Sequence, residues 1–173
     1  MIEIGARSLI EPSQKVQMRS IIANAFPEAT FADDFITIPT VIPERTFLEK
    51  AFLLHEEFQK PQERIRVDRM TRHIYDLEKL MDTDFAINAL KNKELYNAIV
   101  EHRRTLTKMK EVDYTTHTPD KINFVPPESV IELWRDDYES MQGQMIYGKS
   151  LTFDKLIERI KELNERFRKI EIN

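Results

Sequence analysis

Apolar side chains recur every three or four positions through most of residues 43–173, and this periodicity constrains the fold more than any other feature of the chain. It is typical of amphipathic helices that share one core. We expect helices over about residues 46–58, 66–81, 85–90, 93–109, 130–141 and 151–170. A loop is expected over residues 113–127, which hold three prolines.

The first 42 residues have a different character. We expect a strand over residues 2–9, a helix over residues 14–25 capped by Ser13, and an edge strand over residues 35–42 that contains Pro39. The predicted fold class is therefore mainly α (α+β), a multi-helix domain with one or two short N-terminal strands. Residues 1–173 are expected to form a single domain.

Composition excludes several classes of protein. The 173 residues include no cysteine, so disulfide frameworks, thiolate zinc sites and cysteine nucleophiles are excluded. A net charge of −4 argues against a generally cationic nucleic-acid-binding surface. The charged N-terminus and the lack of a long apolar run indicate neither a secretory signal nor a membrane span, so a cytoplasmic location is expected.

Residues 143–150, Gly-Gln-Met-Ile-Tyr-Gly-Lys-Ser, match the P-loop pattern letter for letter. A P-loop needs a strand before it and a helix after it, whereas helical periodicity precedes this segment. We therefore favour a turn between two helices, with Ser150 or Thr152 starting the last one.

No metal site is predicted. Asp137 and Glu139 lie within helical periodicity, where side chains at positions i and i+2 point in different directions and cannot converge on one metal ion. Both are therefore expected on a solvated face. Asp82 and Asp84 lie at a helix junction and are expected to cap. The four histidines, which lack metal-ligand spacing and are expected to be helix-surface or half-buried residues, are His55, His73, His102 and His117.

A basic stretch over residues 60–73 has five basic residues against two acidic ones. In the helix predicted there, Arg69, Arg72 and Asp76 fall on one side, opposite the apolar stripe. They form either a solvated face with an Arg72 to Asp76 ion pair or an anion-binding site. Lys50 flanks the apolar stripe of the preceding helix and either extends into solvent or points toward this face.

The last predicted helix carries a heptad seam from Phe153 to Ile170. The seam either packs on the protein's own core, which we favour because it is short, or pairs with a second copy or an antitoxin.

Two blocks, residues 43–55 and 69–77, together resemble the third and fourth motifs of the AbiEii/AbiGii toxins, and residues 141–168 resemble the end of that family. These are nucleotidyltransferase-like proteins of bacterial type IV toxin–antitoxin and abortive-infection systems. The resemblance covers nearly the whole chain but only the family's C-terminal half. It implies that Lys50 contacts nucleotide phosphate, that Asp76 is catalytic, and that Arg69, Arg72 and His73 support substrate binding.

The resemblance also implies an N-terminal core with a Gly-Ser loop and paired metal-binding carboxylates, and the chain carries neither motif. Mg²⁺ and a nucleoside triphosphate are then expected only when that core completes the site, and the chain alone is expected to be inactive. Residues 1–42 would border the core. The expected partners are an antitoxin or a separately encoded core, with a homodimer through residues 153–170 as a further possibility. The alternative function is a non-catalytic helical interaction module.

Overall fold

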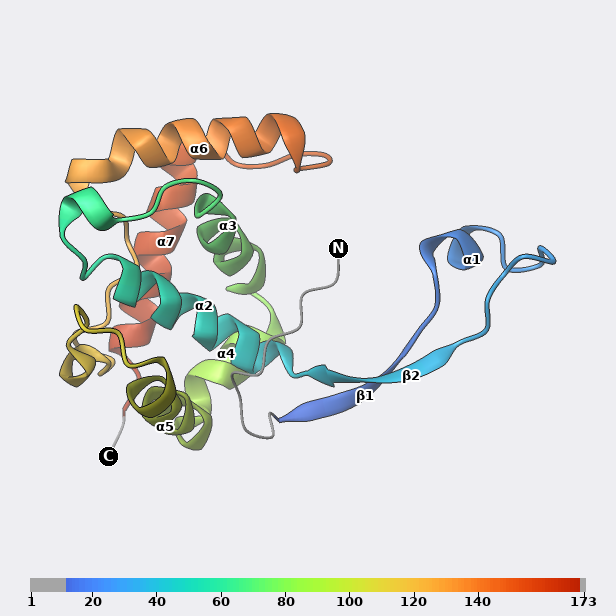
Figure 1. Ribbon diagram of the computed structural model, residues 1–173, viewed down its shortest axis with the longest axis horizontal. Helices are drawn as coiled ribbons and strands as arrows, with labels where there is room; N and C mark the ends of the chain where they lie inside the picture. Colours follow the sequence, from blue (N-terminus) through green and yellow to red (C-terminus); the bar gives the residue numbers. More distant parts are fainter. Residues whose placement is uncertain (1–11, 172–173) are drawn as a thin grey trace. The chain divides into compact units, whose positions relative to one another are not determined.

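The structure is a computed structural model in which residues 12–171 are described (Figure 1). Contacts divide the chain into two compact units, residues 1–43 and residues 44–173, and each is described by itself. The strand predicted over residues 2–9 lies outside the described residues.

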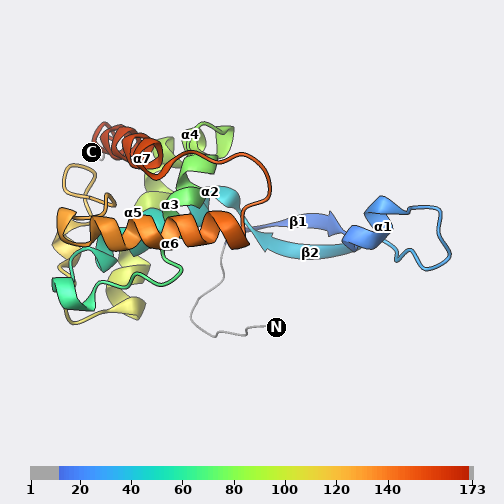
Figure 2. The ribbon, with the colours of Figure 1, turned by 90° about the horizontal axis from the view of Figure 1, so that it is seen from above.

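The first unit is a two-stranded antiparallel ribbon, in which β1 (Ser13–Met18) pairs with β2 (Ile36–Val41), and α1 (Ile21–Ala25) lies in the connection (Figure 2). In the antiparallel register of the two strands, Val16 lies opposite Ile38 and Met18 opposite Ile36, whereas Lys15 lies opposite Pro39. Because side chains alternate along a strand, one face of the ribbon is apolar and the other largely polar.

The strand predicted over residues 35–42 is confirmed, but the helix predicted over residues 14–25 is wrong at its start. Residues 13–18 pair with β2 instead, so cross-strand contacts outweigh local helical spacing. The helix cap is Ser20 rather than Ser13. Its hydroxyl accepts from the Ala23 amide at 3.0 Å, and its own amide donates to Asp33 at 2.9 Å.

The second unit is helical, so a mainly α fold with short N-terminal strands is confirmed. Its α-helices are α2 (Pro43–Glu57), α3 (Thr71–Leu80), α4 (Asp84–Lys91), α5 (Lys93–His102), α6 (Ile131–Gln144) and α7 (Phe153–Arg168). A π turn (Arg103–Thr107) extends α5, and 3₁₀ turns occur at Gln62–Arg64, Tyr114–Thr116 and Glu128–Val130. None of the helices in the described part of the chain is both long and apolar enough to cross a bilayer.

Two predicted helix starts are wrong. α2 begins at Pro43, a residue suited to the first helical position, rather than near residue 46. Glu49 accepts from Arg45, 3.1 Å away. α3 begins at Thr71 rather than near residue 66.

The core is organised around α7, and α3 contacts both α6 and α7 (Figure 1). Along α7 the buried side chains are Phe153, Leu156, Ile157, Ile160, Leu163, Asn164 and Phe167. The Phe167 ring lies 5.8 Å from Phe47 and 5.0 Å from Phe124, centroid to centroid. The heptad seam therefore packs on the protein's own core, as favoured, and the homodimer predicted through residues 153–170 loses the exposed seam it required.

Leu163→Ala tests this packing. Leu163 is fully buried, so we expect the free energy of unfolding to fall by about 2–5 kcal/mol through lost burial and an unfilled cavity. Urea denaturation measures it, with the exposed Lys161→Ala as a control expected to change stability by less than about 0.5 kcal/mol. Equal stability of the two variants would contradict the assignment of the seam to the core.

Candidate functional site

Lys50 and Asp76, two residues from different helices, meet in an ion pair. The Lys50 Nζ on α2 lies 2.8 Å from the Asp76 Oδ2 on α3, and the two side chains are 22% and 40% exposed. Of the two alternatives for Lys50, the orientation toward Asp76 is the one observed. The pair remains accessible, so an incoming anion can compete with Asp76 for the ammonium group.

His73 lies one helical turn before Asp76 on α3. Burial lowers the pKa of His73 to about 4, and the positive charges of Lys50 and Arg72 contribute to this effect. The imidazole is therefore neutral at neutral pH. Its Nδ1 atom is buried and has no hydrogen-bond partner among residues 12–171. His73 thus offers this site a neutral ring with an unused nitrogen rather than a third positive charge.

Arg69 and Arg72 are both exposed. The predicted alternative in which Arg72 pairs with Asp76 is not observed, because Asp76 pairs with Lys50. Neither guanidinium group has a carboxylate partner among the described residues, so both retain their donors for an anion.

The turn that leads into α3 explains why this helix starts late. Arg69 has a left-handed backbone with φ of 57°, which is incompatible with a helix running through residues 66–70. Asp137 on α6 accepts hydrogen bonds from the Arg69 amide at 2.7 Å, the Thr71 amide at 3.1 Å and the Thr71 hydroxyl at 2.5 Å. Asp137 therefore caps α3 from a neighbouring helix, and its predicted solvated position is wrong. Glu139 is exposed as expected.

A pocket of about 430 Å³ lies beside this turn. Its lining residues are Asp68, Arg69, Arg72, Asp137, Ser140, Met141, Gln144 and Met145. Two of the predicted supporting residues, Arg69 and Arg72, line it, whereas Lys50, His73 and Asp76 do not. A pocket of about 500 Å³ near Tyr96 and His117 contains none of the predicted site residues.

The segment that matches a P-loop is a turn between helices, as favoured. Gly143 lies within α6, and Gly148 has a φ of 98°. The Tyr138 hydroxyl and the Gln142 amide of α6 both donate to the Leu151 carbonyl, at 3.0 and 2.9 Å. Bonds from α6 thus hold the turn against the preceding helix, which leaves no P-loop geometry.

The remaining carboxylates and histidines form no metal cluster: residues 12–171 contain no group of three or more His, Asp or Glu side chains that could hold an ion. Asp82 does not cap a helix as predicted but binds the α7 residues Arg159 and Arg166, the latter at 2.8 Å. Asp84 lies in the first turn of α4, where Thr83 is the cap residue.

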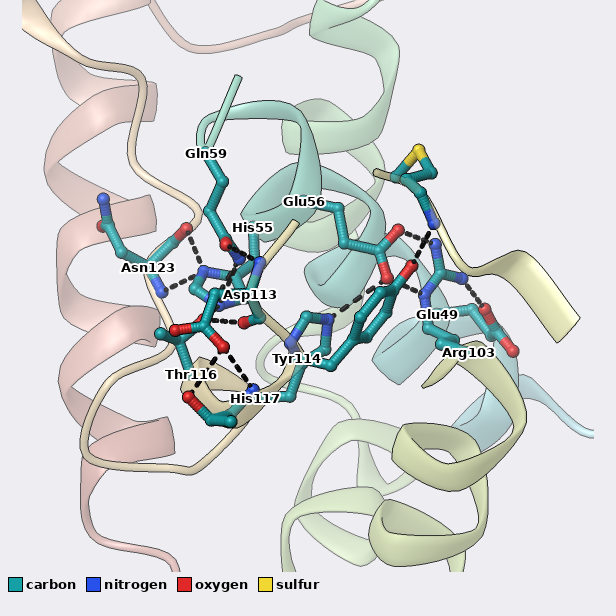
Figure 3. Close-up of polar contacts among 12 residues, drawn as sticks. Glu49, His55, Glu56, Gln59, Arg103, Asp113, Tyr114, Thr116, His117 and Asn123 are labelled. Atoms are coloured by element: carbon teal, nitrogen blue, oxygen red, sulfur yellow. Dashed lines mark hydrogen bonds and ion pairs between the residues drawn. The ribbon is translucent and has the colours of Figure 1, made fainter. Parts of the chain in front are cut away.

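A buried polar cluster, shown in Figure 3, was not predicted from the sequence. Glu56 on α2 is fully buried and accepts from Arg103 Nε at 2.6 Å, while His117 Nε2 lies 3.1 Å from the same carboxylate. Burial by itself raises the pKa of Glu56, but the hydrogen bonds from Arg103 and His117 outweigh it and hold the pKa below its usual value. Arg103 also pairs with Glu49, so one guanidinium joins two carboxylates of α2 to the end of α5.

His55 and His117 are buried at the centre of this cluster, so the prediction that they are helix-surface or half-buried residues is wrong for these two. Burial, together with a smaller effect of the neighbouring His117, lowers the pKa of His55 to about 4. The His55 Nε2 lies 3.0 Å from the Thr116 hydroxyl, and the two imidazole rings are 4.9 Å apart. With its carboxylate paired and inaccessible, the cluster is a structural link rather than a second reactive site.

Arg103→Met tests this link. Removing the guanidinium leaves Glu56 buried without its strongest partner, so we expect a loss of about 3–5 kcal/mol in unfolding free energy, measured by urea denaturation. The adjacent Arg104→Met removes an exposed ion pair with Glu101 and should cost less than about 1 kcal/mol. A loss for Arg103→Met no greater than that of its neighbour would show that the cluster does not hold the helices together.

Comparison with protein families assigns the chain to one of them. The model of the family described as nucleotidyl transferase AbiEii toxin, type IV toxin–antitoxin system, matches residues 1–159. No curated protein and no solved structure matches the chain. The family match spans the ribbon, the Lys50–Asp76 pair and most of the helical unit. The chain therefore belongs to the AbiEii family of nucleotidyltransferase toxins.

Proposed function

We propose that this chain contributes a phosphate-contacting lysine, Lys50, and a catalytic aspartate, Asp76, to an AbiEii-type nucleotidyl transfer. The observation that carries the proposal is the 2.8 Å contact between these two side chains, which come from separate helices and remain partly exposed. The family assignment supports the reaction class. Arg69, Arg72 and His73 have supporting roles in substrate binding.

The two charged groups divide the chemistry. An ammonium group is a compact donor to phosphate oxygens, so Lys50 would orient the triphosphate and balance charge that develops during transfer. When phosphate takes over the ammonium group, the Asp76 carboxylate is released from its ion pair. It is then able to accept a proton from the acceptor hydroxyl.

Nucleotidyl transfer of this type uses Mg²⁺, which clamps phosphate oxygens. The described residues do not fit that ion by themselves, because they offer no cluster of three metal-ligating side chains. Metal binding would therefore fall to a separate nucleotidyltransferase core, and the chain alone is expected to be inactive.

The ribbon of the first unit supports such a core. Its apolar face is open, with Met18, Ile36 and Ile38 exposed by 48%, 60% and 37%. A two-stranded ribbon is marginally stable alone, so this face needs a cover. β1 contains no proline, and within residues 12–171 it pairs only with β2, so its other edge is open to a strand from outside the described chain. We propose that the sheet of the core supplies the pairing strands.

A non-catalytic interaction module remains the second candidate. Large apolar side chains around α1 favour it: Ile21, Phe26 and Phe31 are 86%, 60% and 66% exposed. An antitoxin is the expected partner in this case, and both candidates place the protein in the cytoplasm.

Lys50→Ala tests the phosphate contact. Loss of a charge-assisted hydrogen bond should weaken binding of a nucleoside triphosphate about tenfold or more, measured by isothermal titration calorimetry. The matched control is Lys79→Ala, an exposed lysine of α3 that pairs with Glu78 and should leave binding unchanged. Asp76→Asn should preserve or strengthen binding because it removes the competing carboxylate, while it abolishes transfer in the completed enzyme. Equal affinities of wild type and Lys50→Ala would overturn the site assignment.

The existence of the proposed core can be tested from the DNA sequence around the gene. We expect DNA immediately upstream of the Met1 codon, or a neighbouring gene, to encode a Gly-Ser-type loop and paired carboxylates. Mixing that core with this chain should then give Mg²⁺-dependent nucleotide transfer. If no such core is encoded nearby, catalysis is contradicted and the interaction module becomes the better proposal.

A further inference from the structure

The pocket beside α3 has two chemically different walls. Arg69 and Arg72 stand on one side, and the α6 residues Ser140, Met141 and Gln144, with Met145 directly after the helix, form the other. We propose that this pocket binds one nucleotide unit, with its phosphate at the two arginines and its base against α6, and that it selects bases carrying an exocyclic amino group. The inference rests on the proposed function and specifies the ligand that Arg69 and Arg72, its supporting residues, would bind.

The arginine wall is built for an anion. Both guanidinium groups are exposed and lack carboxylate partners within the described residues, so their donors are available to phosphate oxygens. Arg69 is held in a left-handed conformation that costs free energy in a residue other than glycine. Asp137 stabilises that conformation through the Arg69 and Thr71 amides. Strain maintained beside a cavity is a feature of ligand sites.

The α6 wall suits a flat aromatic ring. Met141 is buried, and Met145 is 49% exposed although it is apolar. A thioether is soft and polarisable and makes favourable contacts with aromatic rings. Gln144 Nε2 donates to the Ser140 hydroxyl over 3.3 Å, which leaves its amide oxygen and a second proton for the edge of a base. The volume of about 430 Å³ lies within the range of small-molecule sites.

Asp68 provides the selectivity. Its side chain lines the pocket, is exposed, and is acceptor-only when ionised. A carboxylate accepts from the amino group of cytosine and, by the same chemistry, of adenine, whereas the corresponding oxygen of uracil repels it. The second carboxylate in the pocket, Asp137, already accepts three hydrogen bonds from the turn before α3, so it does not read the base.

The pocket lies close to the proposed reaction site. Arg72 and Asp76 are four residues apart on α3, which corresponds to about 6 Å along the helix axis. A nucleotide held at Arg72 is therefore within one nucleotide length of the Lys50–Asp76 pair. This nucleotide is either part of the triphosphate substrate or one residue of an acceptor strand.

Amide NMR titration of the full chain with AMP, CMP and UMP tests the inference. We expect shifts at residues 68–72 and 140–145, with AMP and CMP binding roughly tenfold more tightly than UMP. Asp68→Asn places an amide donor where the acceptor was and should reverse that order. Asp136→Asn is the matched control, because Asp136 is exposed on α6 and does not line the pocket. Gln144→Ala should weaken the binding of all three nucleotides without unfolding the chain.

The two sources are separated by combining variants. If the triphosphate places its base in the pocket, Gln144→Ala and Lys50→Ala both weaken triphosphate binding. If an acceptor strand occupies it, Gln144→Ala weakens binding of a short single-stranded oligonucleotide but leaves the triphosphate unaffected. Equal binding of UMP would overturn the base selectivity, and a lack of shifts along residues 140–145 would overturn the nucleotide pocket. Neither result would alter the Lys50→Ala test, so failure of this inference and failure of the proposed function are distinguishable.

Discussion

The helical unit depends most on the hydrogen bonds and ion pair of the fully buried Glu56 carboxylate. A charge in that position is tolerated only when it is paired, and Arg103 and His117 provide the partners from segments far along the chain. Glu49, one heptad earlier on α2, binds the same arginine. These bonds fix the rotation of α2 about its axis. Because Lys50 follows Glu49 directly, the same bonds set the direction in which Lys50 leaves the helix.

A second polar contact sets the position of α3. Asp137 ends the preceding loop at Thr71, so the helix presents Arg72, His73 and Asp76 in a defined register. If the helix ran from residue 66, as its periodicity suggests, Arg69 would lie on the helix surface beside Arg72. The left-handed turn moves Arg69 off the helix to the rim of a pocket. The pocket thus exists because a carboxylate of α6 replaces a cap that the local sequence does not contain.

These two contacts show what the sequence could and could not predict. Helices of the second unit are marked by their own apolar periodicity, and Phe153 to Phe167 identified the buried side of α7 correctly. The orientation of Lys50 toward Asp76 was one of the two alternatives that the helix faces left open. The partners of Glu56 and Asp137, by contrast, lie 47 to 68 residues away along the chain, so no local pattern reveals them. Residues 13–18 were misassigned for the same reason, because their strand exists only through pairing with β2.

The charge distribution around α3 gives the site a resting state. Lys50 and Asp76 neutralise each other, and His73 stays neutral because burial and two neighbouring cations oppose its protonation. Only the exposed arginines present uncompensated positive charge. An arriving polyanion would thus meet Arg69 and Arg72 first and reach Lys50 only by displacing Asp76. Under the proposed function, the Asp76 carboxylate would be released by the same event that places phosphate beside it, which would couple substrate binding to the activation of Asp76.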